Sequence, residues 1–366
     1  MKAWTRALRG KTTPAPSQPA QGYVTPAKLV RVRLVLGTSN SSLGLVLLVV
    51  VSWTIFGLGG SGFLSSFNLY SVGQLAARDA VLGMAQAALI VIARMNLAVG
   101  SIGAICASVL GYLLVSASVP LPLALVAVCV VGVFASLLMG IVELRSGLSS
   151  FIVTLAFLSA YGGAALLATG AVQYQITSKA LNRLGNGSLF VSSLCPLVVV
   201  ALACGVLVWL LYTRNGLGWR MLAVGSNEQA ARVSGVNVRT VVLASYAISG
   251  LLCAVAAVME SSYQLNVNAG VGSDWLLPSF IAPVLGGLAL TGGDISVIGI
   301  LLAALFYDSL QSGLTILNVP TYWLELAEGL VLLVAVVLDH LRHSRRRSAR
   351  LMPTEVVTVL AEEQVV

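Results

Sequence analysis

The chain has 366 residues, of which 58% are hydrophobic and only 9% are charged, and its mean hydropathy is +0.94. Soluble domains carry about 25% charged residues, so this composition excludes an ordinary soluble protein and indicates that lipid surrounds most of the chain. The five cysteines are scattered singly, and the two histidines, His340 and His343, lie near the C-terminal end. These counts predict no disulfide framework, no metal site, no cofactor and no catalytic histidine inside the membrane.

Residues 1–40 are rich in Pro, Ser, Thr and Gln together with Lys and Arg, which predicts a flexible basic tail. Apolar segments near the ~20 residues needed to cross a membrane then recur as far as residue 340. The predicted spans are 42–60, 70–93, 98–118, 121–142, 149–170, 193–212, 240–262, 276–292, 297–317 and 321–340. We therefore expect an all-α polytopic membrane protein of about ten spans, with a membrane domain over 41–340 and a C-terminal tail over 341–366. The span 276–292 is the least regular, because prolines and glycines interrupt it.

The placement of the basic residues supports this count. With ten spans both termini lie on one side of the membrane, and 18 of the 21 Lys and Arg residues lie on that side too. Lys179 and Arg183 lie on the opposite side, and Arg78 lies within a span. The positive-inside rule then predicts that both termini are cytoplasmic. The net charge of +8 comes from these cytoplasmic segments, so it indicates no nucleic-acid partner.

The longest predicted cytoplasmic connection covers residues 213–239. Within it, Ser226-Asn227-Glu228 can cap a short helix over Gln229–Ser234, which Gly235 then ends. A short helix held between two spans suits a transporter that takes force from a cytoplasmic motor. A solvated interhelical loop is the alternative, and residue spacing alone favours that alternative.

This connection resembles the cytoplasmic coupling loop of the ribose, xylose and galactose permeases of binding-protein-dependent ABC importers. The family pattern, G-R-x-x-x-A-x-G-x-N-x-x-A-A-x-x-S-G-[IV]-x-V, is met by Gly218, Ala223, Gly225, Asn227, Ala230, Ala231, Ser234, Gly235, Val236 and Val238. Trp219 stands where the family usually has arginine. The resemblance implies that ATPase subunits dock here, through Gly225, Asn227, Glu228, Ala230, Ala231, Ser234 and Gly235.

Three further motifs resemble the same family and follow in the family's order. They are Asn96-Leu97-Ala98-Val99-Gly100-Ser101, Ser150-Phe151-Ile152-Val153-Thr154-Leu155, and Val284-Leu285-Gly286-Gly287 with Gly292-Gly293. Together the matches extend over about residues 67–340. The family usually has aspartate at the position of Asn96 and serine at that of Ala98. A second, different permease could supply the missing carboxylate, so the sequence leaves open whether the pore is a homodimer or a heterodimer.

Glycine-rich breaks inside apolar segments leave backbone N–H and C=O groups without helical hydrogen bonds. Within a membrane, such unpaired groups are tolerated only where protein or a water-filled cavity satisfies them. The breaks at 94–101 and 291–296 are therefore candidates for an inner gate, although close helix packing through small residues is the alternative. The candidate pathway or gate residues are Asn96, Gly100, Ser101, Gly286, Gly287, Gly292, Gly293 and Asp308.

Charged residues within spans are costly and informative. Arg78-Asp79 lies early in the second predicted span, Asp308 in the middle of the ninth, and Glu325 and Glu328 at the start of the tenth. We expect these groups to snorkel or to pair locally within the bundle. This explanation fits Asp308 least well, because it lies in the middle of a span.

These features predict a permease subunit of an ATP-binding-cassette importer in the bacterial inner membrane, which translocates a monosaccharide or small polyol. The chain itself is expected to have no catalytic site and no ATPase activity. The expected partners are cytoplasmic ATPase subunits, a second permease copy or paralogue, a periplasmic sugar-binding protein and the lipid bilayer. An ion-coupled secondary transporter, with Asp308 and Asp79 carrying the ion, is the main alternative, and a membrane enzyme or scaffold is a third.

Overall fold

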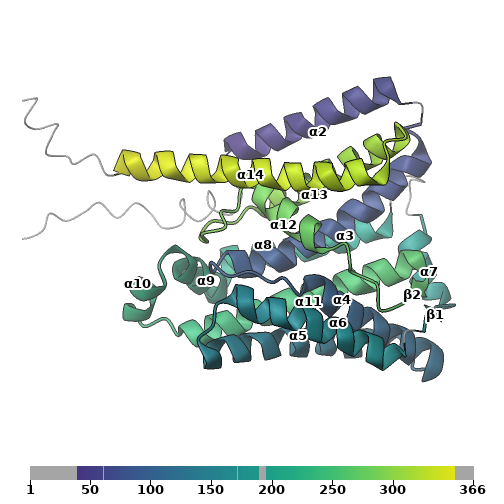
Figure 1. Cartoon of the computed structure of the whole chain (residues 1–366), viewed down its shortest axis with the longest axis horizontal. Coiled ribbons are helices and arrows are strands. Elements are labelled where there is room, and N and C mark those ends of the chain that lie inside the picture. Colours follow the sequence, from purple (N-terminus) through teal and green to yellow (C-terminus); the bar gives the residue numbers. More distant parts are fainter. Residues whose placement is uncertain (1–38, 61, 171, 189–194, 351–366) are drawn as a thin grey trace, which may run out of the picture.

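The computed structural model describes residues 39–60, 62–170, 172–188 and 195–350, which form a bundle of helices aligned roughly along one axis (Figure 1). The tail predicted over 1–40 falls almost entirely outside the described residues, as do residues 351–366 of the predicted C-terminal tail. The helices before the first strand are α2 (Ser39–Gly59), α3 (Ser66–Ile90), α4 (Val99–Gly111) with the π-helical turn η1 (Tyr112–Ser116), α5 (Leu121–Ser146) and α6 (Ser150–Thr169). Those after it are α7 (Lys179–Asn186), α8 (Pro196–Arg214), α9 (Gly216–Ser226), α10 (Glu228–Val233), α11 (Val238–Gln264), α12 (Leu276–Leu285), α13 (Val297–Ile316) and α14 (Thr321–Arg350).

Strand β1 (Tyr174–Gln175) pairs antiparallel with β2 (Asn266–Val267) and links the connection after α6 to the connection after α11. Together with α7, this small sheet lies at one end of the bundle, and α9 and α10 lie at the other (Figure 1). We call these the α7 end and the α10 end.

Local sequence sets where several helices begin and end. The Ser65 hydroxyl accepts the Asn68 N–H at the start of α3, and Asn237 caps α11 in the same way through Thr240. Gly147 ends α5 and Gly170 ends α6 in the left-handed conformation, which glycine adopts without strain.

Six helical stretches of the described chain are long and apolar enough to cross a membrane: α4 with η1, α5, α6, α8, α11 and α13. Large apolar side chains on the outer helices are exposed, for example Phe134 on α5, Phe151 on α6 and Leu207 on α8. Such a surface is unfavourable in water and suits contact with lipid. The chain is therefore an all-α, multi-pass membrane protein.

Helix α3 occupies the centre of the bundle and packs against α8, α11, α12 and α13. Its residues from Ala76 to Ile90 are all buried, and Arg78 and Asp79 lie among them. Because protein surrounds this helix, it can carry two charged side chains that a lipid-facing helix would expose to hydrocarbon.

Helix α12 differs from the full span predicted over 276–292. It has 10 residues and is about 15 Å long, roughly half the hydrocarbon thickness. Irregular backbone precedes it, and residues 286–296 after it form turns and extended chain up to α13. Gly287, Gly292 and Gly293 in this segment have positive φ angles, which a continuing helix does not allow.

Candidate functional site

Two irregular segments meet at the α10 end of the bundle. One covers 91–98, between α3 and α4, and the other covers 286–296. The Gly293 N–H donates to the carbonyl oxygen of Val91 at 3.0 Å. The first irregular segment overlaps the break predicted over 94–101 but begins and ends three residues earlier, and the second contains the break predicted over 291–296. The two segments lie against each other, although Val91 and Gly293 are 202 residues apart in the sequence.

Helix α9 packs directly onto this meeting point through Gly225. A Cβ atom on Gly225 would lie 1.7 Å from the Val91 carbonyl oxygen and 2.9 Å from the Gly293 nitrogen. A Cβ on Gly292 would in turn lie 3.0 Å from the Gly225 carbonyl oxygen. Only glycine permits this approach, because ordinary carbon–oxygen contacts are about 3.3 Å or longer. We call Val91, Gly225, Gly292 and Gly293 the backbone junction.

The short helix predicted in the 213–239 connection is α10. Its cap is Asn227, whose Oδ1 accepts the Ala230 N–H at 2.9 Å, and it ends just before Ser234 and Gly235, the latter with φ +83°. Ala231 is only 5% exposed, so its side chain packs within this chain and is not offered to a partner. The surface of α10 instead presents Ala230 and Val233, and Val233 is 91% exposed. Sequence reasoning missed Val233, although an apolar residue in a short polar helix was its visible signal.

A charge network connects α10 to the bundle. Glu228 forms ion pairs with Arg232 at 3.0 Å and with Arg94 at 3.5 Å. Arg94 also donates to Glu143 of α5, and Tyr246 of α11 donates to the other oxygen of the same carboxylate. The side chains of Arg94 and Glu143 are only 16% and 6% exposed. Arg94 thus ties the first irregular segment to α5, α10 and α11.

The predicted residues of the 96–101 motif have packing and capping roles near this network. Buried Asn96 accepts the Ala98 N–H through Oδ1 at 2.9 Å. An aspartate at this position could accept the same hydrogen bond. Ser101 donates to the Leu158 carbonyl at 2.7 Å, and a Cβ on Gly100 would lie 2.0 Å from the Gly272 carbonyl oxygen.

Gly286 and Gly287 end α12 and let it pack closely against the start of α13. A Cβ on Gly286 would lie 2.8 Å from the Ile300 nitrogen, and Gly287 has φ +92°. The structure thus brings Gly225, Gly292 and Gly293 together, whereas Gly100, Ser101 and Gly286 line separate helix contacts.

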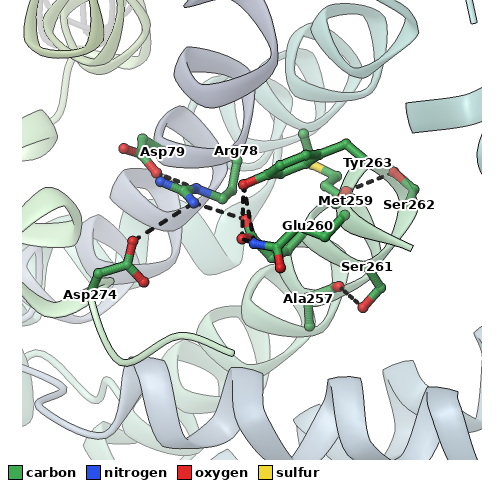
Figure 2. Close-up of polar contacts among 10 residues, drawn as sticks. Arg78, Asp79, Ala257, Met259, Glu260, Ser261, Ser262, Tyr263 and Asp274 are labelled. Carbon is green, nitrogen blue, oxygen red and sulfur yellow. Dashed lines mark hydrogen bonds and ion pairs between the residues drawn. The ribbon is translucent and has the colours of Figure 1, made fainter. Parts of the chain in front are cut away.

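A second polar cluster surrounds Arg78 (Figure 2). Arg78 donates to Asp79 at 2.6 Å and to Glu260 of α11 at 2.8 Å. The expected local pairing of Arg78 with Asp79 is therefore confirmed, but Glu260 was missed because it lies 182 residues away. Its signal was a lone carboxylate within the predicted span 240–262.

Asp308 of α13 is only 1% exposed. It interacts electrostatically with Asp79 and Arg78, so it belongs to the Arg78 cluster and not to the backbone junction. Glu328 pairs locally, accepting from Gln311 at 3.1 Å, while Glu325 is exposed. No group of three or more metal-ligating side chains occurs in the described part of the chain.

A protein-family model described as "Branched-chain amino acid transport system / permease component" matches residues 79–336. The match includes both irregular segments, α9, α10 and most of the helices. The chain belongs to this permease family. It is therefore a transport component without a catalytic site of its own, and the resemblance found in the sequence motifs is confirmed.

Curated permeases of import systems are similar to this chain over most of their length. The autoinducer 2 import system permease protein LsrC of Escherichia coli O9:H4 (strain HS) is 30% identical over 314 residues, 85% of this chain and 91% of LsrC. The galactose/methyl galactoside import permease protein MglC of Escherichia coli K12 is 28% identical, over 82% of this chain and 94% of MglC. The ribose import permease protein RbsC of Bacillus subtilis 168 is 29% identical, over 84% and 92%. No solved structure matches the permease.

Proposed function

We propose that this permease is the membrane-spanning subunit of an ATP-binding-cassette importer that moves a monosaccharide or small polyol across the bacterial inner membrane. The names of its relatives support the solute class, since they include galactose and ribose permeases. The observation that carries the proposal is the contact of Gly225 with Val91 and Gly293. It joins a surface helix pair, able to receive force, to two breaks in the bundle, able to move.

Ten membrane crossings, with both termini and the α10 end in the cytoplasm, fit this role. Helices α2 and α13 run in the same direction. Trp53 lies beside Ser309, and further along both helices Gly60 lies beside Ile316. The start of α2 and the last turns of α14 therefore lie at the α10 end (Figure 1). In this arrangement 1–40 and 341–366 are cytoplasmic tails around a membrane domain over 41–340. The short helix α12 and the irregular chain on either side of it together make one crossing.

Helix α10, with the end of α9, acts as the coupling element of the 213–239 connection and sits in a groove of the ATPase. Asn227, Ser234 and Gly235 set the limits of the helix, and Glu228 connects it to Arg94. Ala231 anchors the helix to the permease, while Ala230 and Val233 face the ATPase. Nucleotide-driven movement of α10 would then reach the bundle by two routes, the Gly225 contact and the Glu228–Arg94 pair.

The backbone junction serves as the inner gate. Gly292 and Gly293 supply its hinge, because positive φ angles let the segment 286–296 turn without strain. Asn96, Gly100, Ser101, Gly286 and Gly287 hold the neighbouring helices in register. Asp308 lies with the Arg78 cluster, toward the α7 end, where it belongs to the pathway and not to the gate.

The complete importer contains two ATPase subunits, a periplasmic sugar-binding protein docked at the α7 end and a second permease. The second permease is either another copy of this chain or a paralogue. Relatives named as LsrC and LsrD, two different permease proteins of autoinducer 2 import systems, both match this chain, and this supports a paralogue.

The proposal is tested at Val233. Val233→Asp should abolish or strongly reduce co-purification with the ATPase and sugar-stimulated ATP hydrolysis, because it places a charge in an apolar contact. Membrane insertion should stay normal, since Val233 is 91% exposed in the isolated chain. Val172→Asp, at an exposed valine of the α7 end, is the matched control for ATPase co-purification. Normal ATPase binding and coupled hydrolysis in Val233→Asp would refute docking on α10.

A further inference from the structure

An open polar cavity lies at the α7 end of the permease. Its volume is 560 Å³, within the ~300–1,000 Å³ that small-molecule sites usually have. Its walls are formed by α3, by the end of α11, by the irregular chain that precedes α12, and by α13. Hydrogen-bonding side chains dominate the lining: Arg78, Glu260, Gln264, Asn268, Asp274 and Gln311.

Two charged residues of the lining, Arg78 and Glu260, are held in place by buried contacts. Glu260 is 4% exposed and accepts from Arg78 at 2.8 Å and from Tyr263 at 2.9 Å (Figure 2). Gln264 also donates to Glu260. Asp274 faces Arg78 at 4.0 Å but keeps 68% of its side chain exposed. The cavity therefore combines a preformed wall with an exposed carboxylate, that of Asp274, which can meet a solute.

Close packing adjoins the cavity next to its lining residues Gly272 and Asp274. Trp275, fully buried, lies against Gly103, where a Cβ would come within 2.2 Å of the indole ring. Beside it, the Gly272 carbonyl packs on Gly100. Helix α12 begins directly after this packing, at Leu276. Irregular backbone at this depth is tolerated in a membrane where it lines a cavity.

The balance of charge around the cavity is acidic. Arg78 is the only basic side chain among the described residues of the lining. Glu260 and Asp274 also line the cavity, and Asp79 forms an ion pair with the Arg78 guanidinium. Three carboxylates around one guanidinium repel an anionic solute. Carboxylate and amide oxygens accept hydrogen bonds from hydroxyl groups without requiring a charge on the solute.

We propose that this cavity is the permease's own binding site for a neutral polyhydroxylated solute, and that it disfavours anionic sugars. The proposal rests on the sugar-import function and assigns the solute contacts to Asp274, Gln264, Asn268 and Gln311. Arg78 is a positioning residue that holds Glu260 and Asp274. A solute delivered at the α7 end enters this cavity before it meets the closed packing at Trp275.

Protection of an introduced thiol tests the site without relying on transport. Ser273 lines the cavity and is exposed, so Ser273→Cys in the full-length permease should react with a hydrophilic, membrane-impermeant methanethiosulfonate. Ribose, galactose and xylitol serve as neutral probes, and ribose 5-phosphate and galacturonate as anionic ones. At least one neutral probe should slow labelling of Ser273→Cys, and neither anion should. Leu75→Cys, at a half-buried lining position with no assigned solute contact, provides a second position should the first variant not fold.

Val172→Cys, exposed at the same end but outside the cavity, is the control and should show no protection. Adding Asp274→Asn to Ser273→Cys should raise the half-protecting concentration of the neutral probe about tenfold or more, since a hydrogen bond to a charged group is lost. Equal protection by the anions would overturn the charge argument. An importer that takes up a neutral probe with ATP while none protects either thiol would overturn the site. Absence of any ATP-dependent uptake would instead overturn the underlying function.

Discussion

Gly225→Ala is the sharpest perturbation of the backbone junction. The added methyl group would lie 1.7 Å from the Val91 carbonyl oxygen, so α9 and Val91 must separate by about 1.5 Å to reach an ordinary contact. Overpacking of this kind costs about 1–3 kcal/mol, and loss of the hydrogen bond from Gly293 to Val91 adds about 1 kcal/mol. The higher helix propensity of alanine stabilises the folded state by about 1 kcal/mol and offsets part of this cost. We therefore expect a net destabilisation of about 1–3 kcal/mol.

The functional expectation goes beyond stability. Because the methyl group separates α9 from both irregular segments, ATP-driven solute uptake per folded molecule should fall several-fold, while ATPase binding to the untouched surface of α10 persists. Thermal melting of the purified permease, ATPase co-purification and uptake in vesicles measure the three quantities. Gly216→Ala is the matched control, since nothing lies within 4 Å of a Cβ at that position of the same helix. Wild-type melting and wild-type uptake in Gly225→Ala would refute the junction as a gate.

Three further predictions concern other parts of the chain. Reporter fusions after Arg350 should report cytoplasm and those at Asn182 periplasm; a periplasmic result after Arg350 would contradict the ten crossings. Arg94→Ala should destabilise the permease by about 3 kcal/mol in a melting assay, because it leaves the buried Glu143 carboxylate without its cation. Adding Glu143→Gln should recover much of that loss, whereas recovery of nothing would argue against the ion pair as its cause. Asp308→Asn should leave uptake independent of proton and sodium gradients, as in the parent; collapse of parental uptake by an uncoupler at constant ATP would favour ion coupling.

The sequence alone determined the class of the protein and most of its helices. Composition and the recurrence of ~20-residue apolar segments are local properties, and they predict membrane helices without knowledge of contacts. The limits of α10 were also predictable, because an asparagine cap and a glycine stop act within one helical turn. The family motifs followed from short runs of residues and placed the chain among import permeases.

The tertiary structure decided which of these local features meet. Glycine predicts a backbone break or a close approach but does not name its partner, so the contact of Gly225 with Val91 and Gly293 was invisible until the chain was folded. The same holds for Glu260, whose guanidinium partner lies 182 residues away. It holds as well for Ala231, which the fold buries while leaving Val233 exposed. Hydrogen bonds, ion pairs and packing act over a few ångströms of space, and only the path of the whole chain sets which residues come within that distance.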